Sequence, residues 1–253
     1  SKELHKPVVK VFERRPILAN EKDEIWAADL CIMETSDKGY KYILTIIDVY
    51  TRFCFAKPLT NKTGNSVKKA FQEVFDEWKR KPKYLLTDRG AEFYNYEMKS
   101  LLNRYQIHMY STESELKASI CERMVKTLKH KMERVITTKQ ILKEKISWSE
   151  ILIDIVYDYN YKNKHSFLKT TPFLASEDSF QPQLKELWQP VFHKSMVSKS
   201  SIELAKFKVG DFVRLYKYKT QFEQGYKTNF TKEIFKIKQV QPTHPITCII
   251  EDS

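Results

Sequence analysis

Three acidic side chains stand where carboxylates could work together: Asp29, Asp88 and Glu122. Asp29 falls in the middle of an apolar run with strand-like alternation, where an ionised carboxylate is costly unless it is paired or binds a metal. Asp88 ends a short apolar strand, and ligands of open α/β sheets usually bind beside such strand ends. Glu122 begins a helix face that continues with Lys126 and Lys129, at the i, i+4 and i+7 spacing of one side of a helix.

Carboxylates that converge from a strand, a strand end and a helix suit a hard divalent cation. Mg²⁺ prefers oxygen ligands and keeps water or phosphate in its remaining positions. Two such ions, roughly 3.5–4 Å apart, can activate an attacking oxygen and stabilise the leaving oxygen in phosphoryl transfer. Each acid also has a structural interpretation: Asp88 as a turn former, Asp29 as half of a buried salt bridge, and Glu122 as half of a surface ion pair with Lys126. We favour the metal site because all three acids occur together in this order.

The elements that must position these carboxylates follow from hydrophobic periodicity. Three strands come first; a helix, a strand, a helix and a strand follow, and two long helices complete the series. We place them at residues 25–33, 42–49, 53–59, 65–79, 84–87, 94–105, 107–110, from 120 onward, and 149–164. The polar segment 111–119 has no periodicity and predicts a loop before the helix of Glu122. The order β-β-β-α-β-α-β-α-α is typical of an α/β fold in which helices pack on a five-stranded mixed sheet.

The remainder of the chain predicts an arm, a linker and a second domain. Residues 1–20 are rich in Lys and Arg, contain two prolines and read as a basic arm. After the core domain at 21–180, the polar segment 181–205, with prolines at 182 and 190, is expected to be a linker. Residues 206–253 change to short alternating runs without a helical pattern, and they predict a small all-β barrel.

Composition narrows the class of protein. Hydrophobic residues make up 42% of the chain and aromatic residues 13%, as in globular proteins. Lys and Arg outnumber Asp and Glu by 44 to 32, which indicates an anionic partner, most often nucleic acid, although a lysine-rich genome would give the same bias. No run of about 18 apolar residues occurs, so we expect no membrane partner. Four scattered cysteines without a CxxC pair predict a reduced intracellular compartment, and no Cys/His cluster has zinc spacing.

Several sequence blocks, taken in order, resemble those of a known family. They are Trp26-Ala27-Ala28-Asp29-Leu30, then IIDVYTRF at 46–53, TDRGAEF at 87–93, KASICER at 117–123, and Thr171-Pro172-Phe173. In these blocks the chain resembles the catalytic region of retroviral-type integrases and DDE transposases (the rve family), closest to the integrases of Polinton (Maverick) elements and of virophages. The resemblance covers roughly residues 21–180, and the spacing of Asp88 and Glu122 is close to the family's usual gap.

The resemblance implies a ribonuclease-H-like fold and a metal-bound triad of Asp29, Asp88 and Glu122, with Mg²⁺ as the cofactor and Mn²⁺ as a substitute. It also implies a polynucleotidyl transferase with nuclease activity, which processes 3′ ends of DNA and joins them to target DNA. Lys126 and Lys129 match positions at which the family's catalytic helix touches DNA.

The loop before that helix matches the family's substrate-contacting loop, and Lys117 is its expected DNA contact. This loop also departs from the family, because Glu113 and Glu115 would repel a phosphate backbone. Position 125 is a second departure: the family often has Asn there, and this chain has Val125.

The C-terminal segment resembles the family's C-terminal module, which is Src-homology-like or chromodomain-like. Arg214, Lys217 and Lys219 alternate with Tyr216 and Tyr218, a pattern suited to contacts with a phosphate backbone or to base stacking. A solvated face over a tyrosine core would give the same pattern. A chromodomain-like fold would instead contact chromatin through a histone tail, which requires an aromatic cage.

Two further acids have structural interpretations that we prefer. Asp48 could be a fourth metal ligand, but an ion pair with Arg52 at the strand end is favoured. Glu92 is expected to interact with the start of a helix.

The sequence therefore predicts a DNA integrase or transposase of a mobile element or virus, acting on double-stranded DNA ends and target DNA as a homo-oligomer. Its expected location is nuclear or intracellular, or in a virion. Two alternatives remain open. One is a domesticated, catalytically inactive DNA-binding protein of the same fold, and the other is a nuclease that only hydrolyses.

Overall fold

The computed structural model describes residues 3–5, 17–111, 119–144, 146–195, 205–217, 228–241, 243 and 246–252. The chain forms two compact units: Ile17–Trp188, and Ser1–Pro16 together with Gln189–Ser253. The Glu113 and Glu115 loop, Lys117, Lys219 and most of the basic arm lie outside the described residues. Among the described helices, none is both long and apolar enough to cross a membrane.

The first unit is built on a five-stranded sheet with the strand order β3-β2-β1-β4-β5. Its elements are β1 (Ile25–Asp37), β2 (Tyr40–Asp48), β3 (Cys54–Leu59), α1 (Gly64–Trp78), β4 (Tyr84–Thr87), α2 (Tyr96–Tyr105), β5 (His108–Ser111), α3 (Ser119–Ile141) and α4 (Trp148–Tyr157). The first three strands are antiparallel neighbours, whereas β4 and β5 run parallel to β1. The predicted order of strands and helices is confirmed, and so is the mixed sheet.

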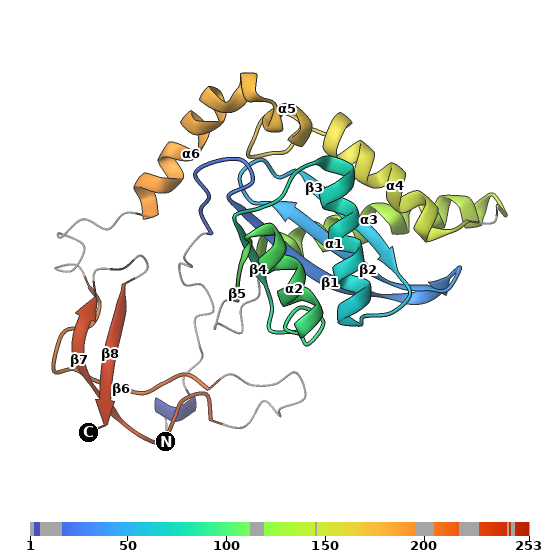
Figure 1. The fold of residues 1–253 in the computed structure, drawn as a ribbon. Helices are drawn as coiled ribbons and strands as arrows, with labels where there is room; N and C mark the ends of the chain where they lie inside the picture. Colours follow the sequence, from blue (N-terminus) through green and yellow to red (C-terminus); the bar gives the residue numbers. More distant parts are fainter. Residues whose placement is uncertain are drawn as a thin grey trace. The chain divides into compact units, whose positions relative to one another are not determined.

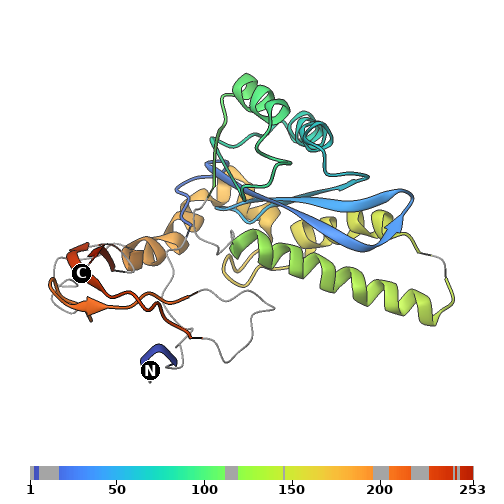
Figure 2. The same cartoon turned by 90° about the horizontal axis from the view of Figure 1, so that it is seen from below.

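Helices cover both faces of this sheet. Figures 1 and 2 show α1 and α2 on one face and α3 and α4 on the other. The α1 and α2 face holds a large apolar cluster in which Trp26 and Ala28 of β1 pack with side chains of these two helices. Because side chains alternate along a strand, Ala27 and Asp29 belong to the face of α3 and α4. The alternation of β1 therefore assigns Asp29 to a definite side of the sheet.

Local signals in the sequence set the ends of the two helices on the first face. Thr63 and Asn95 precede α1 and α2, and their side chains accept hydrogen bonds from the backbone N–H groups of Ser66 and Met98. Such caps satisfy N–H groups that have no partner inside the helix.

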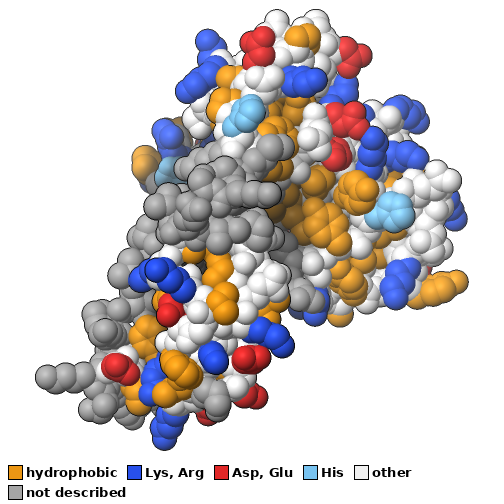
Figure 3. Space-filling model, turned by 90° about the vertical axis from the view of Figure 1, so that its left-hand side faces the viewer, with side chains coloured by type: hydrophobic (Ala, Val, Ile, Leu, Met, Phe, Trp, Pro, Cys, Tyr) orange, Lys and Arg blue, Asp and Glu red, His pale blue; other side chains and the backbone are white. Residues whose placement is uncertain are grey.

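The two edge strands of the sheet differ. Strand β3 carries Pro58, which cannot donate to a ladder and is tolerated at an edge. Strand β5 is the other edge, and two of the exposed large hydrophobic side chains, Tyr84 and Tyr110, lie on β4 and β5. Figure 3 looks onto this side of the molecule, where hydrophobic side chains gather at the surface.

The segment after α4 is more helical than the sequence predicted. It contains the π-helix η2 (Asp158–Lys162), α5 (Pro172–Ser176), the 3-10 helix η3 (Asp178–Phe180) and α6 (Gln181–Ser195). The expected linker at 181–205 is therefore wrong over 181–195, which is helical despite Pro190. Leu184 and Trp188 explain the difference, because both side chains are buried and anchor the first part of α6.

The second unit contains a three-stranded antiparallel sheet, in the order β6-β7-β8, within its described residues. The strands are β6 (Phe212–Val213), β7 (Phe235–Gln241) and β8 (Thr247–Asp252). A short 3-10 helix, η1 (Glu3–His5), contributes the carbonyl of Leu4, which accepts a hydrogen bond from the N–H of Asn229. The predicted all-β character is present, but the described strands do not establish a barrel.

Candidate active site

Asp29 lies on β1, in the centre of the sheet, opposite Thr45 of β2. Its side chain is half-buried, and its Oδ1 accepts a hydrogen bond from the backbone N–H of Leu30 at 2.9 Å. Burial on the α3 side of a central strand places a charged group where water is scarce. Asp29 therefore has the surroundings of a ligand or a paired acid.

Asp88 follows the last residue of β4 and is also half-buried. Its Oδ1 accepts a hydrogen bond from the N–H of Gly90 at 3.0 Å, which stabilises the turn after the strand. A Cβ at position 90 would lie 2.6 Å from the carboxyl carbon of Glu92, so only glycine fits without displacing that side chain. The carboxyl group of Glu92 thus lies against Gly90 of this turn.

Parallel pairing brings Asp29 and Asp88 to corresponding positions. The ladder pairs Ile25 with Tyr84 and Ala27 with Leu86. Asp29 stands two residues after Ala27, and Asp88 stands two residues after Leu86. Neighbouring strands lie about 4.8 Å apart, so a continuation of this register brings the backbone of Asp88, just past the end of β4, next to that of Asp29 on β1.

Glu122 lies in the first turn of α3, and its side chain is exposed. The preceding residue, Cys121, is buried and anchors this turn, because its Sγ lies 3.6 Å from the carbonyl oxygen of Thr45 and 3.9 Å from that of Ala27. Thr45 is the register partner of Asp29. Burial raises the pKa of the Cys121 thiol well above its usual value, and the nearby carboxylates of Asp29 and Glu122 add to this effect.

The donor set suits a hard divalent cation, because all three predicted ligands are carboxylates. One comes from β1, one directly follows the neighbouring strand β4, and the third comes from a helix that is anchored over β1 and β2. Within the described ranges, however, no three carboxylate, histidine or cysteine side chains lie close enough together to hold a metal ion. The chain thus supplies suitable donors, of which the described geometry pairs Asp29 with Asp88.

The predicted DNA contacts on α3 differ in their surroundings. Lys126 is exposed, one turn after Glu122. Lys129 is exposed too, but its ammonium donates a hydrogen bond to the backbone carbonyl of Ile32 on β1 at 2.9 Å. Lys129 therefore helps to hold α3 against the sheet and can offer a phosphate only its remaining N–H groups.

The predicted contacts in the second unit also divide. Arg214 is largely engaged inside this unit, since its guanidinium donates to the carbonyls of Thr231 and Lys232 and lies 3.8 Å from the carboxylate of Glu3. Lys217 is exposed. Of these two cations, Lys217 is better placed to meet an external anion.

The expected partner of Asp48 is wrong. Asp48 is fully buried and pairs with Arg80, whose Nη2 lies 2.9 Å from its Oδ2, and not with Arg52. Arg80 also forms a two-pronged contact with Asp23 and lies over the rings of Phe53, Phe55 and Trp26. Sequence reasoning overlooked Arg80 because it follows the end of α1, far along the chain from its partners.

Arg52 instead lies between aromatic rings. Its guanidinium carbon is 5.2 Å from the ring centre of Trp188 and 5.7 Å from that of Phe167. Burial lowers the pKa of Arg52 to about 10. These contacts connect the β2–β3 turn to the segment after α4.

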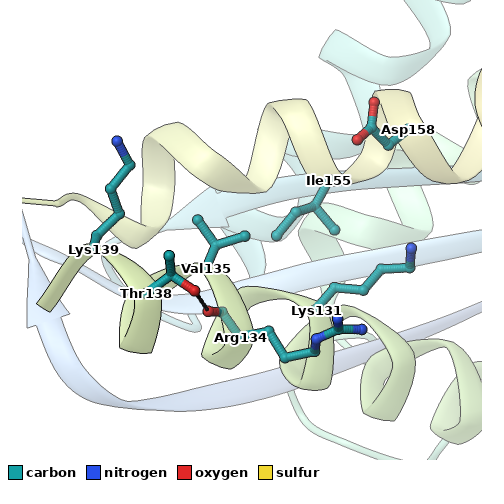
Figure 4. A pocket seen from close by; sticks show the side chains of 7 residues that line it. All are labelled: Lys131, Arg134, Val135, Thr138, Lys139, Ile155 and Asp158. Carbon is teal, nitrogen blue, oxygen red and sulfur yellow. Dashed lines mark hydrogen bonds between the residues drawn. The ribbon is translucent and has the colours of Figure 1, made fainter. Parts of the chain in front are cut away.

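A pocket of about 340 Å³ lies elsewhere on this face, between α3 and α4 (Figure 4). Val135 and Ile155 form its apolar floor, and Lys131 and Arg134 approach it from α3. It begins more than two turns after Glu122 and includes none of the three predicted ligands. This pocket is therefore separate from the candidate active site.

Comparisons with known proteins bear on the fold of the core domain and on the class of protein that it resembles. Residues 19–114 match the family model of the integrase core domain, a segment that includes Asp29 and Asp88 but not Glu122. The chain is 31% identical over 197 residues to the transposon-derived protein F54H12.3 of Caenorhabditis elegans. That alignment covers 78% of this chain and 62% of the relative, so the chain spans less than two thirds of the relative's length.

Two solved structures share the fold. The magnesium-bound catalytic core of HTLV-2 integrase, in its trimeric form, has a TM-score of 0.53 at 16% identity and covers 61% of this chain and 97% of its own. A chain of the simian T-cell lymphotropic virus intasome, solved with a PP2A regulatory subunit, has a TM-score of 0.67 at 12% identity and covers 94% and 77%. The ribonuclease-H-like fold predicted for the core domain is thereby confirmed.

Proposed function

We propose that this protein is a DNA integrase or transposase that processes 3′ DNA ends and joins them to target DNA. The observation that carries the proposal is the parallel pairing of β1 with β4, whose register continues to Asp29 and Asp88, together with the anchoring of the first turn of α3 on β1 and β2. The integrase core match over residues 19–114 supports the same class of protein.

In this proposal Asp29, Asp88 and Glu122 hold Mg²⁺, with Mn²⁺ as a substitute. The bound ions supply activation of an attacking oxygen and stabilisation of a leaving oxygen. The sheet fixes the backbone positions of the two aspartates, and Cys121 fixes the helix turn from which Glu122 extends. Lys126, exposed on the next turn, adds positive charge where a phosphate backbone would pass.

A joining assay tests the proposal without knowledge of the natural DNA ends. The full chain is incubated with Mg²⁺ or Mn²⁺, a supercoiled plasmid and a pool of labelled duplexes with randomised ends, and junctions are sequenced. We expect joined products from the natural protein and a loss of more than about a hundredfold in Asp88→Asn, since losing even an outer partner of a metal ligand costs up to that much. Asp76→Asn is the matched control, because Asp76 is exposed on α1, on the opposite face of the sheet. Equal joining by Asp88→Asn and the natural protein would refute the assignment.

A non-catalytic DNA-binding protein is the second candidate. Within the described part of the chain no three possible ligands lie close enough together to hold a metal ion, an arrangement that a non-catalytic protein of this fold would also have. Salt-sensitive DNA binding without nicking or joining would identify this function. Plasmid cleavage without junctions would instead identify a nuclease that only hydrolyses.

Finer features follow from the same proposal. We propose that the protein acts on double-stranded DNA as a homo-oligomer, belongs with Polinton or virophage integrases, and works in the nucleus or another intracellular compartment or in a virion. Contact of the second unit with chromatin is part of this proposal. Cross-linking with and without DNA tests the oligomer.

A further inference from the structure

Three aromatic side chains form an exposed cluster at one end of β4 and β5. The ring centres of Tyr84 and His108 lie 5.9 Å apart, and those of Tyr84 and Tyr110 lie 6.4 Å apart at an interplanar angle of 79°. Tyr84 is 42% exposed and Tyr110 37% exposed, and His108 is also exposed. With Glu24 and Ile25 these rings line a pocket of about 520 Å³, a size typical of ligand sites.

This cluster, here called the tyrosine platform (Tyr84, His108 and Tyr110), belongs to the face of the sheet that carries Asp29. The ladder pairs Tyr84 with Ile25 on one side and with His108 on the other, and Leu86 with Tyr110. Register partners in neighbouring strands share a face, and Ile25 and Asp29 share a face because they are four residues apart on β1. The platform and the candidate active site are thus on the same side of the sheet.

The distance between them fits a strand of nucleic acid. Tyr84 and Asp88 are four residues apart along extended backbone, or about 13 Å at about 3.3 Å per residue. Stacked nucleotides advance about 3.4 Å each, so a strand whose phosphate lies at the carboxylates reaches the platform within about four nucleotides.

We infer that the tyrosine platform binds the bases of unpaired nucleotides next to the DNA end that enters the active site. This inference rests on the proposed function for the nature of its ligand. Every base has a π-face, so aromatic rings bind unpaired strands whatever their sequence. The near-perpendicular tyrosines present one ring face and one ring edge, which together can hold a flat base.

The polar edges of the platform favour a base over an apolar peptide. Two phenol hydroxyls and an imidazole surround the pocket, and they can hydrogen-bond to the edges of bases. Glu24, which also lines the pocket, would repel a phosphate backbone. The platform therefore suits the bases of a strand, and the phosphates must follow another path.

Binding of short single strands tests the inference. A labelled twelve-nucleotide oligothymidine and an abasic strand of the same length are titrated with the full chain in EDTA, and fluorescence anisotropy gives the affinity. We expect Tyr84→Ala and Tyr110→Ala each to weaken oligothymidine binding by about fivefold or more, the loss expected when one stacked base loses its ring. Both variants should bind the abasic strand as the natural protein does.

Phenylalanine variants and a distant tyrosine provide the controls. Tyr84→Phe and Tyr110→Phe keep the rings and should bind nearly normally, and Tyr96→Ala, at an 81% exposed position on α2, should have no effect. Circular dichroism checks that each variant is folded. Substitutions at these exposed positions should leave the fold intact.

Natural affinity in both alanine variants would overturn the inference, and so would equal losses on the abasic strand. The binding assay contains EDTA and so does not depend on metal-dependent chemistry. A failure of the joining assay would therefore refute the proposed function without changing the binding result, and the reverse also holds.

Discussion

Replacing Arg80 with methionine should destabilise the first unit more than any loss of a surface charge. Arg80 connects Asp23 and Asp48, and its side chain is only 16% exposed. Methionine keeps much of the apolar length that packs on the aromatic rings, so Arg80→Met removes mainly the charge and its hydrogen bonds. The carboxylate of Asp48, fully buried, then loses its ion-pair partner.

The size of the loss follows from what remains around Asp48. Three donors stay in place: the hydroxyl of Thr51 at 2.8 Å, the N–H of Tyr50 at 3.0 Å and the N–H of Asp23 at 3.3 Å. These neutral donors cannot balance a buried charge, and removing one partner of a buried ion pair typically costs about 3–5 kcal/mol. Arg80→Lys keeps the charge but cannot form the two-pronged contact, so we expect an intermediate loss.

Urea unfolding followed by tryptophan fluorescence measures these losses on the full chain, since Trp26 lies beside Arg80. A cycle with Asp48→Asn separates the ion pair from packing. The double variant should lose less free energy of unfolding than the sum of the single variants, with a coupling of about 1–3 kcal/mol. A loss below about 1 kcal/mol for Arg80→Met, or strict additivity in the cycle, would refute this account of Asp48.

Three further predictions concern a histidine, the cysteines and a buried asparagine. His165 has a pKa of about 4 because burial, then Arg52, disfavours its charge. Its unfolded form takes a proton near pH 6.5, so stability should fall as pH drops from about 6.5 to 4, by at most about 3 kcal/mol, and His165→Gln should flatten this part of a urea-unfolding pH profile. Cys248 should react first with a thiol reagent in the native protein, because burial raises the pKa of the Cys54 and Cys121 thiols. Asn160→Ala should cost about 2 kcal/mol or more in urea unfolding, because the Asn160 side chain bonds both the N–H and the carbonyl of Cys54.

Each of these predictions has an outcome that contradicts it. If His165→Gln leaves the pH profile unchanged, the pKa of His165 does not differ between the folded and the unfolded protein, which contradicts the prediction. Rapid labelling that persists in Cys248→Ser would mean that a buried thiol is accessible. For the amide, Asn163→Ala is the matched control at an exposed position, and equal losses in the two variants would exclude a special role for Asn160.

Hydrophobic periodicity was sufficient to predict the helices and strands of the core domain, because each of these elements has a clear pattern of apolar residues. The run Val67, Ala70, Phe71, Val74 and Phe75 gives α1 one buried face, as observed. The second unit has weaker patterns. Its second described strand, β7, has Ile237 as a fully buried residue amid mostly exposed or half-buried neighbours, so the sequence carries little information on how the strands close.

Long-range pairing was harder to predict than the elements themselves. The sequence suggested Arg52 for Asp48 because both lie at a strand end, whereas the observed partner, Arg80, reaches Asp48 from beyond α1. Likewise α6 is helical over a proline-containing polar segment because Trp188 stacks on Tyr50 and its indole N–H donates to the carbonyl of Tyr50. In both cases a tertiary contact overrode the local pattern, which propensity alone cannot anticipate.

The two aspartates illustrate why the sequence suggested a candidate site. Asp29 and Asp88 are distant in the chain, but Asp29 lies within an apolar strand and Asp88 directly follows one, and a half-buried charge at either position requires a reason. In the proposed function, the parallel pairing of β1 with β4 supplies that reason, because its register continues to both aspartates. Glu122 had no such cost, being exposed on a helix, and only the anchoring of Cys121 on β1 and β2 connects it to them. Its role is therefore the most informative to test: Glu122→Gln should abolish joining if it completes the metal site, and should leave joining intact if it is a surface residue.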